Sequence, residues 1–153
     1  DSILYKLMKI ISPETEKEFN AYYKLRYDLL RKPWNQPVGS EKDSLEKISF
    51  HKMVVGNNRL DVLAVGRIQI NSHFEAQIRF MAVSESWQGK GLGTQIITSL
   101  EHVAKSKNIK HIILQSRENA IKFYESNNYR IIKKTYILYD QIQHWLMMKE
   151  IKV

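Results

Sequence analysis

Three glycines at alternate positions, in Gln88-Gly89-Lys90-Gly91-Leu92-Gly93, form the most specific chemical pattern in the sequence. They fall between a strand pattern over residues 76–83 and a helical pattern that begins near Leu92. Glycine lets the backbone approach a ligand closely and adopt positive φ, and the first N–H groups of a helix have no partner within it. The loop therefore predicts a cradle for an anion such as a pyrophosphate. A glycine-rich turn without a ligand is the alternative.

The spacing of these glycines argues against two common phosphate-binding loops. A dinucleotide-binding fold has Gly-x-Gly-x-x-Gly after its first strand and an acidic residue about 20 positions later. Here the spacing is Gly-x-Gly-x-Gly, and several strand patterns precede it. A Walker loop would continue with Gly-Lys-Ser/Thr, and that triplet does not follow.

The elements that must position this loop alternate between helix and strand patterns. In chain order we expect a strand over 4–11, a helix from Pro13 to about Leu30, a loop with one short helix over 31–47, strands over 50–55, 62–70 and 76–83, a helix from 92, a strand over 109–114, a helix over 118–126, and strands over 129–138 and 143–151. This order predicts an α/β fold with one mixed sheet, mostly antiparallel, of about seven strands and with helices on both faces.

Composition narrows the class of protein. A chain of 153 residues without an internal repeat or a linker is expected to form a single domain over 1–153. The chain has no cysteine, which excludes disulfides, thiolate metal sites and cysteine nucleophiles and is compatible with the cytoplasm, where we place the protein. No apolar stretch is long enough to span a membrane. The net charge of +8 lacks long basic runs, so we expect no nucleic-acid partner.

Two motifs together resemble those of the GNAT (Gcn5-related) N-acetyltransferase superfamily. Gln88-x-x-Gly91-x-Gly93 after the strand pattern ending at Val83 resembles its motif A. Ala120-x-x-Phe123-Tyr124-x-x-x-x-Tyr129 resembles a second signature, with Asn128 where the family has glycine. The ending Ile142-Gln143-His144-x-x-Met147 is similar to that of a bacterial ElaA-like subgroup, in which a proline stands where this chain has Gln143.

The resemblance implies a fold, a co-substrate and a set of site residues. It implies that acetyl-CoA binds where the fourth strand separates from the fifth, and that no metal is needed. The pantetheine arm would pair with the strand at Met81, Ala82 and Val83, and the amide of Met81 would also donate to the thioester carbonyl oxygen. The residues implied to bind the rest of acetyl-CoA are Gln88, Gly89, Lys90, Gly91, Leu92, Gly93, Thr94, Asn119 and Tyr124.

Tyr124 matches the family tyrosine that protonates the departing thiolate. The alternative is a core aromatic residue whose hydroxyl is satisfied inside the protein, since Tyr124 stands at helical spacing from Ala120 and beside Phe123.

Several residues are candidates for the base that takes a proton from the amine. They are Glu75, His73, His51 and His144, and a chain of water molecules is a further alternative. For Glu75 the competing interpretation is a surface carboxylate, and for His144 a structural histidine.

The function expected is direct transfer of an acetyl group from acetyl-CoA to a primary amine, with a small molecule as the acceptor. The residues expected to bind the acceptor are Arg26, Arg31, Gln77, Arg79 and His144, and their charge favours a carboxylate or phosphate beside the amine. The alternatives are a non-catalytic acyl-CoA-binding or regulatory module and an acetyltransferase of protein or peptide amines. A homodimer is compatible with the sequence.

Overall fold

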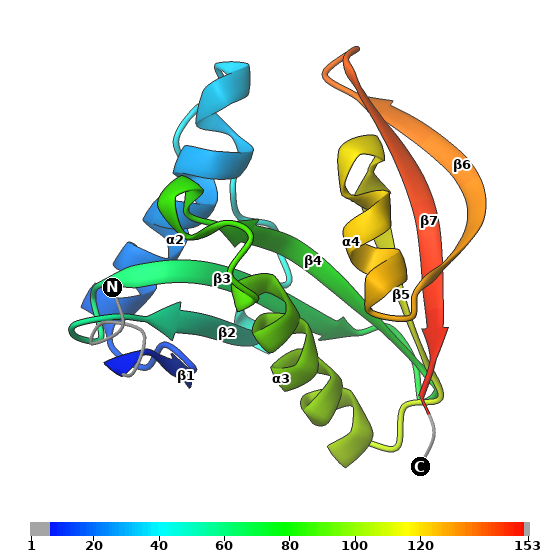
Figure 1. The fold of residues 1–153 in the computed structure, drawn as a ribbon. Helices are drawn as coiled ribbons and strands as arrows, with labels where there is room; N and C mark the ends of the chain where they lie inside the picture. The colour runs from blue at the N-terminus through cyan, green and yellow to red at the C-terminus, as the bar shows by residue number, and fades with distance from the viewer. Residues whose placement is uncertain (1–6, 152–153) are drawn as a thin grey trace.

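The computed structural model describes residues 7–151, which form a seven-stranded sheet flanked by helices (Figure 1). The helices are α2 (Glu16–Leu30), α3 (Leu92–Ser106) and α4 (Ile121–Ser126), with short 3₁₀ helices at Lys32–Trp34, Glu46–Ile48, Glu85–Trp87 and Glu118–Ala120. The strands are β1 (Lys9–Ile11), β2 (Phe50–Val55), β3 (Val62–Ile70), β4 (Glu75–Val83), β5 (His111–Arg117), β6 (Arg130–Leu138) and β7 (Ile142–Glu150).

The strand order in space is β1-β2-β3-β4-β5-β7-β6. Among these strands β4 and β5 pair in parallel, and the other neighbours are antiparallel. The predicted α/β fold with a mixed, mostly antiparallel sheet is therefore confirmed. Within residues 7–151, no helix is both long and apolar enough to cross a membrane.

Element ends differ from the sequence predictions where a side chain caps the chain. Helix α2 begins at Glu16 rather than near Pro13, because the hydroxyl of Thr15 accepts a hydrogen bond from the Glu18 N–H at 3.1 Å. Strand β5 begins at His111 rather than at residue 109, since Asn108 ends the α3 turn with φ of 58°. Residues 4–6 of the first predicted strand lie outside the described residues.

Helices cover both faces of the sheet, and consecutive apolar residues of β2 point alternately to one face and the other. Met53 and Val55 pack with Tyr22 of α2, whereas Val54 packs with the buried stripe of α3. The members of that stripe recur at helical spacing, and the fully buried ones are Leu92, Ile96, Ile97, Leu100 and Ala104. The two helices thus fix the sheet between two apolar layers.

The sheet opens between β4 and β5. The two strands pair from Glu75 opposite His111 to Ile78 opposite Leu114, and beyond that point they diverge. Past the divergence β4 stays paired with β3 and β5 stays paired with β7. Figure 1 shows the result: β1–β4 with α2 and α3 form one half of the molecule, and β5–β7 with α4 form the other.

Candidate active site

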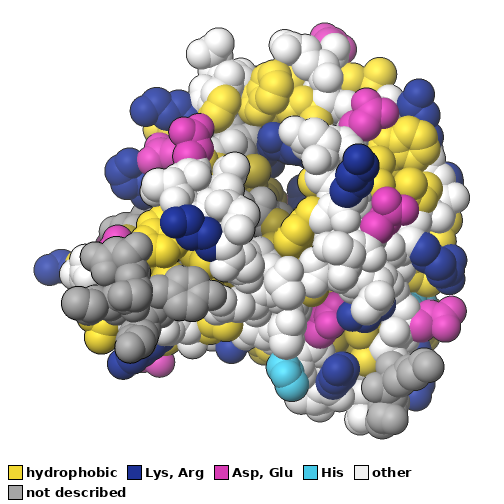
Figure 2. Space-filling view, in the orientation of Figure 1, with side chains coloured by type: hydrophobic (Ala, Val, Ile, Leu, Met, Phe, Trp, Pro, Cys, Tyr) yellow, Lys and Arg dark blue, Asp and Glu magenta, His cyan; other side chains and the backbone are white. Residues whose placement is uncertain are grey.

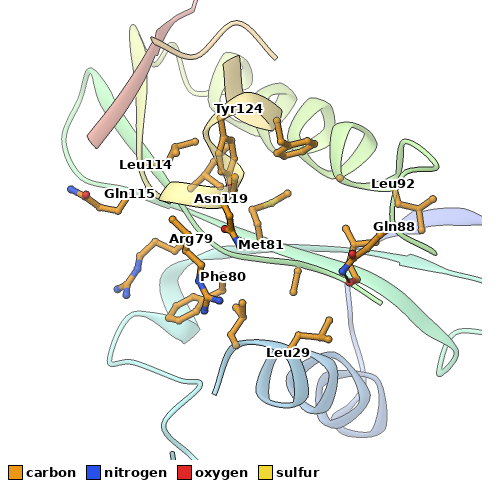
Figure 3. A pocket seen from close by; sticks show the side chains of 18 of the residues that line it. Leu29, Arg79, Phe80, Met81, Gln88, Leu92, Leu114, Gln115, Asn119 and Tyr124 are labelled. Atoms are coloured by element: carbon orange, nitrogen blue, oxygen red, sulfur yellow. Dashed lines mark hydrogen bonds between the residues drawn. The ribbon is translucent and has the colours of Figure 1, made fainter. Parts of the chain in front are cut away.

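A cavity of about 980 Å³ lies where β4 and β5 diverge. Its walls come from the end of α2, the second half of β4, the glycine loop, the first turn of α3, the end of β5, α4 and parts of β6 and β7. Figure 2 shows the surface hollowed between the two halves of the molecule, with Lys or Arg atoms visible inside the hollow. In Figure 3, Gln88 and Leu92 lie at one side of the cavity, Arg79 and Gln115 at the other, and Met81 and Asn119 between them.

We call the part of the cavity formed by residues 88–94 the glycine end. Two of its glycines are required by the backbone, because Gly89 has φ of 73° and Gly91, the N-cap of α3, has φ of 86°. Gly93 is required by packing, since a Cβ there would lie 2.8 Å from the Phe123 ring of α4. The three glycines of the motif therefore serve two purposes, which the sequence spacing did not separate.

Unpaired backbone donors gather at the glycine end. The first helical bond of α3 runs from the Gln95 N–H to the Gly91 carbonyl at 3.1 Å, so the preceding amides have no acceptor within the helix. The Gln88 side chain holds the loop to β4 by donating to the Val83 carbonyl at 3.2 Å. The Thr94 hydroxyl oxygen accepts from Asn127, which leaves its own O–H free to donate. This end of the cavity can therefore bind an anion.

A β-bulge at Phe80 shapes the middle of the cavity. Phe80 has φ of 58°, which is rare for a bulky residue, and neither Phe80 nor Met81 has a register partner on β3 or β5. Guanidinium groups surround the Phe80 ring, with Arg26 at 4.2 Å, Arg79 at 4.6 Å and Arg67 at 4.8 Å from its centroid. The bulge leaves the β4 edge from Met81 to Val83 without a strand on its cavity side.

The arginines beneath Phe80 are held by carboxylates of the loop before β2. Arg67, fully buried on β3, contacts Asp43 and Glu46 at 2.7 Å each, and Arg26 donates to Glu46 at 2.9 Å. Paired charges of this kind are required for buried arginines. These ion pairs hold the guanidinium groups of Arg26 and Arg67 against the Phe80 ring at the bulge.

Tyr124 of α4 packs its ring into the core and also lines the cavity. Its ring meets Phe123 and Tyr129 edge-on, at centroid distances of 5.1 and 6.1 Å. Burial raises the pKa of its hydroxyl, an effect that the charge of Arg117 opposes. No other residue within 7–151 forms a hydrogen bond with this hydroxyl, so the ring fits the core-aromatic interpretation while the hydroxyl is available to a ligand in the cavity.

His144 of β7 is buried, lines the cavity and stacks on Tyr136 at 4.5 Å. Its Nδ1–H donates to the Ile142 carbonyl at 2.9 Å, which leaves a lone pair on Nε2 in the neutral ring. Burial lowers its pKa below the usual 6.5, and the charges of Arg117 and Arg31 add to that effect. A neutral imidazole at this position can accept a proton near pH 7.

Three arginines line the side of the cavity away from the glycine loop, which we call the arginine end. They are Arg31, Arg79 and Arg117. Arg31 donates to the carbonyls of Ser40 and Leu30, each at 3.0 Å, and Arg79 pairs with Asp43 at 3.0 Å. All three charges act on the phenol of Tyr136, where they oppose the rise in pKa that burial causes.

Most residues that the sequence predicted for the site line this one cavity. They are Arg31, Gln77, Arg79, Met81, Ala82, Val83, Gln88, Gly89, Gly91, Leu92, Gly93, Thr94, Asn119, Tyr124 and His144. The sequence reasoning missed Arg117 and Phe80. A charged residue between the strand predicted over 109–114 and the helix predicted over 118–126 was a usable signal for Arg117, but nothing in the sequence indicates positive φ at Phe80.

Three predicted residues lie outside the cavity lining. Glu75 is at the far end of β4, where it accepts from Asn71 at 2.9 Å and pairs with His111 at 3.0 Å, which matches the surface-carboxylate alternative. Arg26 is fully buried and paired with Glu46. The Lys90 ammonium lies 5.1 Å from the Trp87 ring centroid. We therefore retain neither Glu75 as a base nor Arg26 as an acceptor contact.

The other two histidine candidates are also outside the cavity lining. His51 is buried on β2, where its Nδ1 lies 2.9 Å from the Tyr22 hydroxyl and its Nε2 lies 2.8 Å from the Glu46 carbonyl. His73 lies in the turn between β3 and β4. Of the histidines considered, His144 is the one that the fold brings to the cavity.

This cavity and its sheet are those of an acyltransferase fold. A family model described as the acetyltransferase (GNAT) family matches residues 7–129. The chain belongs to that family, and it is an acyltransferase.

Individual relatives agree with that assignment. The chain is 26% identical over 143 residues to the uncharacterized N-acetyltransferase YjcF of Bacillus subtilis (strain 168), a match that covers 94% of this chain and 100% of that protein. Its fold is similar to the crystal structure of Escherichia coli ElaA, with a TM-score of 0.76, 19% identity and coverage of 94% of this chain and 98% of that one. It is also similar to a GNAT family acetyltransferase of Elizabethkingia anophelis with acetyl-CoA bound, with a TM-score of 0.75, 13% identity and coverage of 95% and 99%.

Proposed function

We propose that this protein transfers an acetyl group from acetyl-CoA directly to the primary amine of a small molecule. One observation carries the proposal: the divergence of β4 and β5 makes a single cavity that joins free helix-start amides, an unpaired strand edge, Tyr124 and His144. Each of these features suits one part of acetyl transfer, and the fold brings all of them to the same space.

The residues present fit acetyl-CoA. Gly89 and Gly91 adopt positive φ and have open space where a side chain would stand, so phosphate oxygens can approach the backbone. The edge from Met81 to Val83 has no strand on its cavity side, and an extended amide chain can pair with it, provided that the chain takes the place of the Gln88 side chain at the Val83 carbonyl. Asn119 also lines the cavity and lies beside Met81 in the view of Figure 3, so its amide can hydrogen-bond the same chain.

Acetyl-CoA supplies an acetyl group that is activated as a thioester. In the proposed reaction the N–H of Met81 donates to the carbonyl oxygen, where negative charge develops as the amine attacks. Nε2 of His144 accepts the proton that the amine loses, directly or through one water molecule. The Tyr124 O–H donates a proton to the sulfur as the C–S bond breaks and the C–N bond forms.

The electrostatics of Tyr124 and His144 suit opposite roles. Burial raises the pKa of Tyr124, so its hydroxyl keeps its proton at neutral pH and can donate it. Burial lowers the pKa of His144, so its ring is neutral and can accept one. Two titratable groups whose environments move their pKa values apart are typical of an acid and base pair.

The test is a screen in which free CoA is measured after acetyl-CoA is mixed with amines, amino acids, polyamines, aminoglycosides and peptides. We expect at least one small amine to release CoA faster than buffer alone and to gain the mass of one acetyl group. Release with peptides alone would favour the peptide-amine alternative. Tight binding of acetyl-CoA with no release for any acceptor would favour the non-catalytic module.

A further inference from the structure

The charged side chains that line the cavity are unevenly distributed. Arg31, Arg79 and Arg117 line the arginine end, and the two carboxylates in the lining are Asp28 and Glu85. Asp28 is paired with Lys24 at 2.6 Å, and Glu85 stands in the 3₁₀ helix before the glycine loop. Neither forms an ion pair with the three arginines, and Arg79 pairs with Asp43 from outside the lining, so the charges of Arg31 and Arg117 are the two that no carboxylate of residues 7–151 pairs with.

Arg117 differs from the other arginines of the core. The fully buried Arg26 and Arg67 each pair with carboxylates at 2.7–2.9 Å. The guanidinium of Arg117, by contrast, forms no hydrogen bond or ion pair with any residue in the range 7–151, although the side chain is half-buried in the cavity wall. A guanidinium has five N–H donors in a planar fork that fits a carboxylate or phosphate. Those of Arg117 are available to a ligand.

The position of Arg117 puts its charge beside the proposed chemistry. It ends β5 directly opposite His144 of β7. Its charge acts on Tyr124 and on His144, and burial together with the nearby charge of Arg31 lowers its own pKa. Holding like charges together in a partly buried site is unfavourable, and an anion bound between them removes that cost.

We propose that the acceptor carries an anionic group, a carboxylate or a phosphate, on the same small molecule as its amine, and that Arg117 binds that group with Arg31 and Arg79 beside it. This inference rests on the proposed function. Arg117 is then a specificity residue that interacts with the acceptor rather than with acetyl-CoA.

The same charges favour attack by the amine. Nearby guanidinium groups disfavour an ammonium ion more than a neutral amine, so they help the acceptor nitrogen to lose its proton. They also disfavour polycations, because a polyamine would bring further positive charges to the arginine end. The inference therefore predicts amino acids or phosphorylated amines as acceptors and excludes polyamines.

The experiment uses analogues in which the CoA sulfur is joined through CH₂–CO to the nitrogen of a probe amine. Carboxylate probes are glycine, β-alanine and γ-aminobutyrate, each matched with its neutral amide. The phosphate probe is O-phosphoethanolamine, matched with ethanolamine. Because CoA anchors every analogue, the Kd measured by calorimetry reports the anion contact before the natural acceptor is known.

We expect at least one anionic analogue to bind the wild-type protein about tenfold or more tightly than its neutral partner, the effect of one or two charge-assisted hydrogen bonds. Arg117→Gln should remove that difference while the Kd of CoA itself stays within about twofold of wild type. Arg79→Gln should reduce it, and Arg130→Gln, which changes an exposed arginine on β6, should leave it intact. A preference in the carboxylate series indicates a carboxylate on the acceptor, and a preference for the O-phosphoethanolamine analogue indicates a phosphate.

Two results would overturn the inference while leaving the proposed function standing. One is that CoA binds but every anionic analogue matches its neutral partner within about threefold. The other is that the preference persists in Arg117→Gln and in Arg79→Gln, both folded with wild-type Tm. Failure of CoA itself to bind would instead reject the proposed function, and the inference with it.

Discussion

The two ends of the cavity are built in different ways. At the glycine end, the backbone amides and the helix start within residues 88–94 can bind an anion, so one short segment contains the whole binding site. At the arginine end, side chains from α2, β4, β5, β6 and β7 meet, and the residues are far apart in the sequence. A backbone site suits a ligand that stays the same, whereas a side-chain site can change with single substitutions. We expect the glycine end to determine co-substrate binding and the arginine end to determine the acceptor.

The largest effect is expected for Tyr124→Phe. This variant tests the proton donor that we propose between the glycine end and the arginine end. Loss of a positioned proton donor should lower kcat by about 10² to 10⁴. The Tm should change little, because no residue within 7–151 bonds to the hydroxyl that is removed. Steady-state kinetics and thermal unfolding check both parts. A lowered Tm with wild-type turnover would support the core-aromatic alternative.

A second large effect is expected for His144→Asn at the arginine end. Removing the proposed base should lower kcat/KM by about 10², whereas the Kd of acetyl-CoA, measured by calorimetry, should stay near wild type. Tyr136→Phe keeps the ring that stacks on His144 and serves as the control for packing. If His144→Asn keeps full activity, a water chain rather than His144 takes the proton.

The pH dependence of the same step provides a separate test. A base acts when it is neutral, and burial with the charges of Arg117 and Arg31 lowers the pKa of His144 below 6.5. Activity should therefore persist down to pH 6.5 and fall as the pH drops through a midpoint below that value. A profile of kcat/KM against pH measures the midpoint. A limb centred above 6.5 would contradict the role of His144.

At the glycine end, Gly91→Asp and Gly91→Asn form a matched pair. Both residues tolerate the left-handed conformation that φ of 86° requires, so their effects on folding should be alike. They differ in charge, and a carboxylate near a phosphate should weaken acetyl-CoA binding by about tenfold to a hundredfold relative to Asn. Calorimetry measures the two Kd values. Equal affinities would show that no phosphate lies at Gly91.

The smallest effect is expected for the carboxylates beneath Phe80. Burial tends to raise the pKa of Asp43, but its hydrogen bonds with Arg67 and Leu45 prevail and lower it to about 2. A lowered pKa in the folded state adds stability above the unfolded value of 3.8, and that stability is lost as the pH falls toward 2. Wild-type Tm should therefore drop more between pH 4 and 2 than the Tm of Asp43→Asn. Parallel curves would contradict the role of this ion pair.

Local patterns predicted the order and the kind of the elements. The largely apolar runs over 50–55 and 62–70 and the helical spacing of Leu92, Ile96 and Ile97 are typical of buried elements, so the strands and α3 lie where the sequence predicts them. Asn128, which stands where the family has glycine, adopts the left-handed conformation, with φ of 70°. The start of α2 differs from its predicted position because the side chain of Thr15 caps the helix. The hydrophobic pattern of the sequence does not show where that cap lies.

The candidate site was predictable only in part, for the same reason that its two ends differ. The glycine end is local, so spacing and resemblance indicated nearly all of its residues. Glu75 and Arg26 were misplaced because a strand pattern does not say which end of the strand is paired, or which arginine has carboxylate partners. The positive φ of Phe80 depends on the arginines packed around it, which come from α2, β3 and β4.

The most direct test of the division between the two ends is an NMR titration of ¹⁵N-labelled protein with acetyl-CoA. The account predicts that the largest amide shifts fall at Gly89–Thr94 and at Met81–Val83, with small shifts at Arg31 and Tyr136 on the arginine end. The shifts should saturate at one molecule of acetyl-CoA per chain. Saturable shifts centred on the arginine end, or none in the glycine loop, would contradict it.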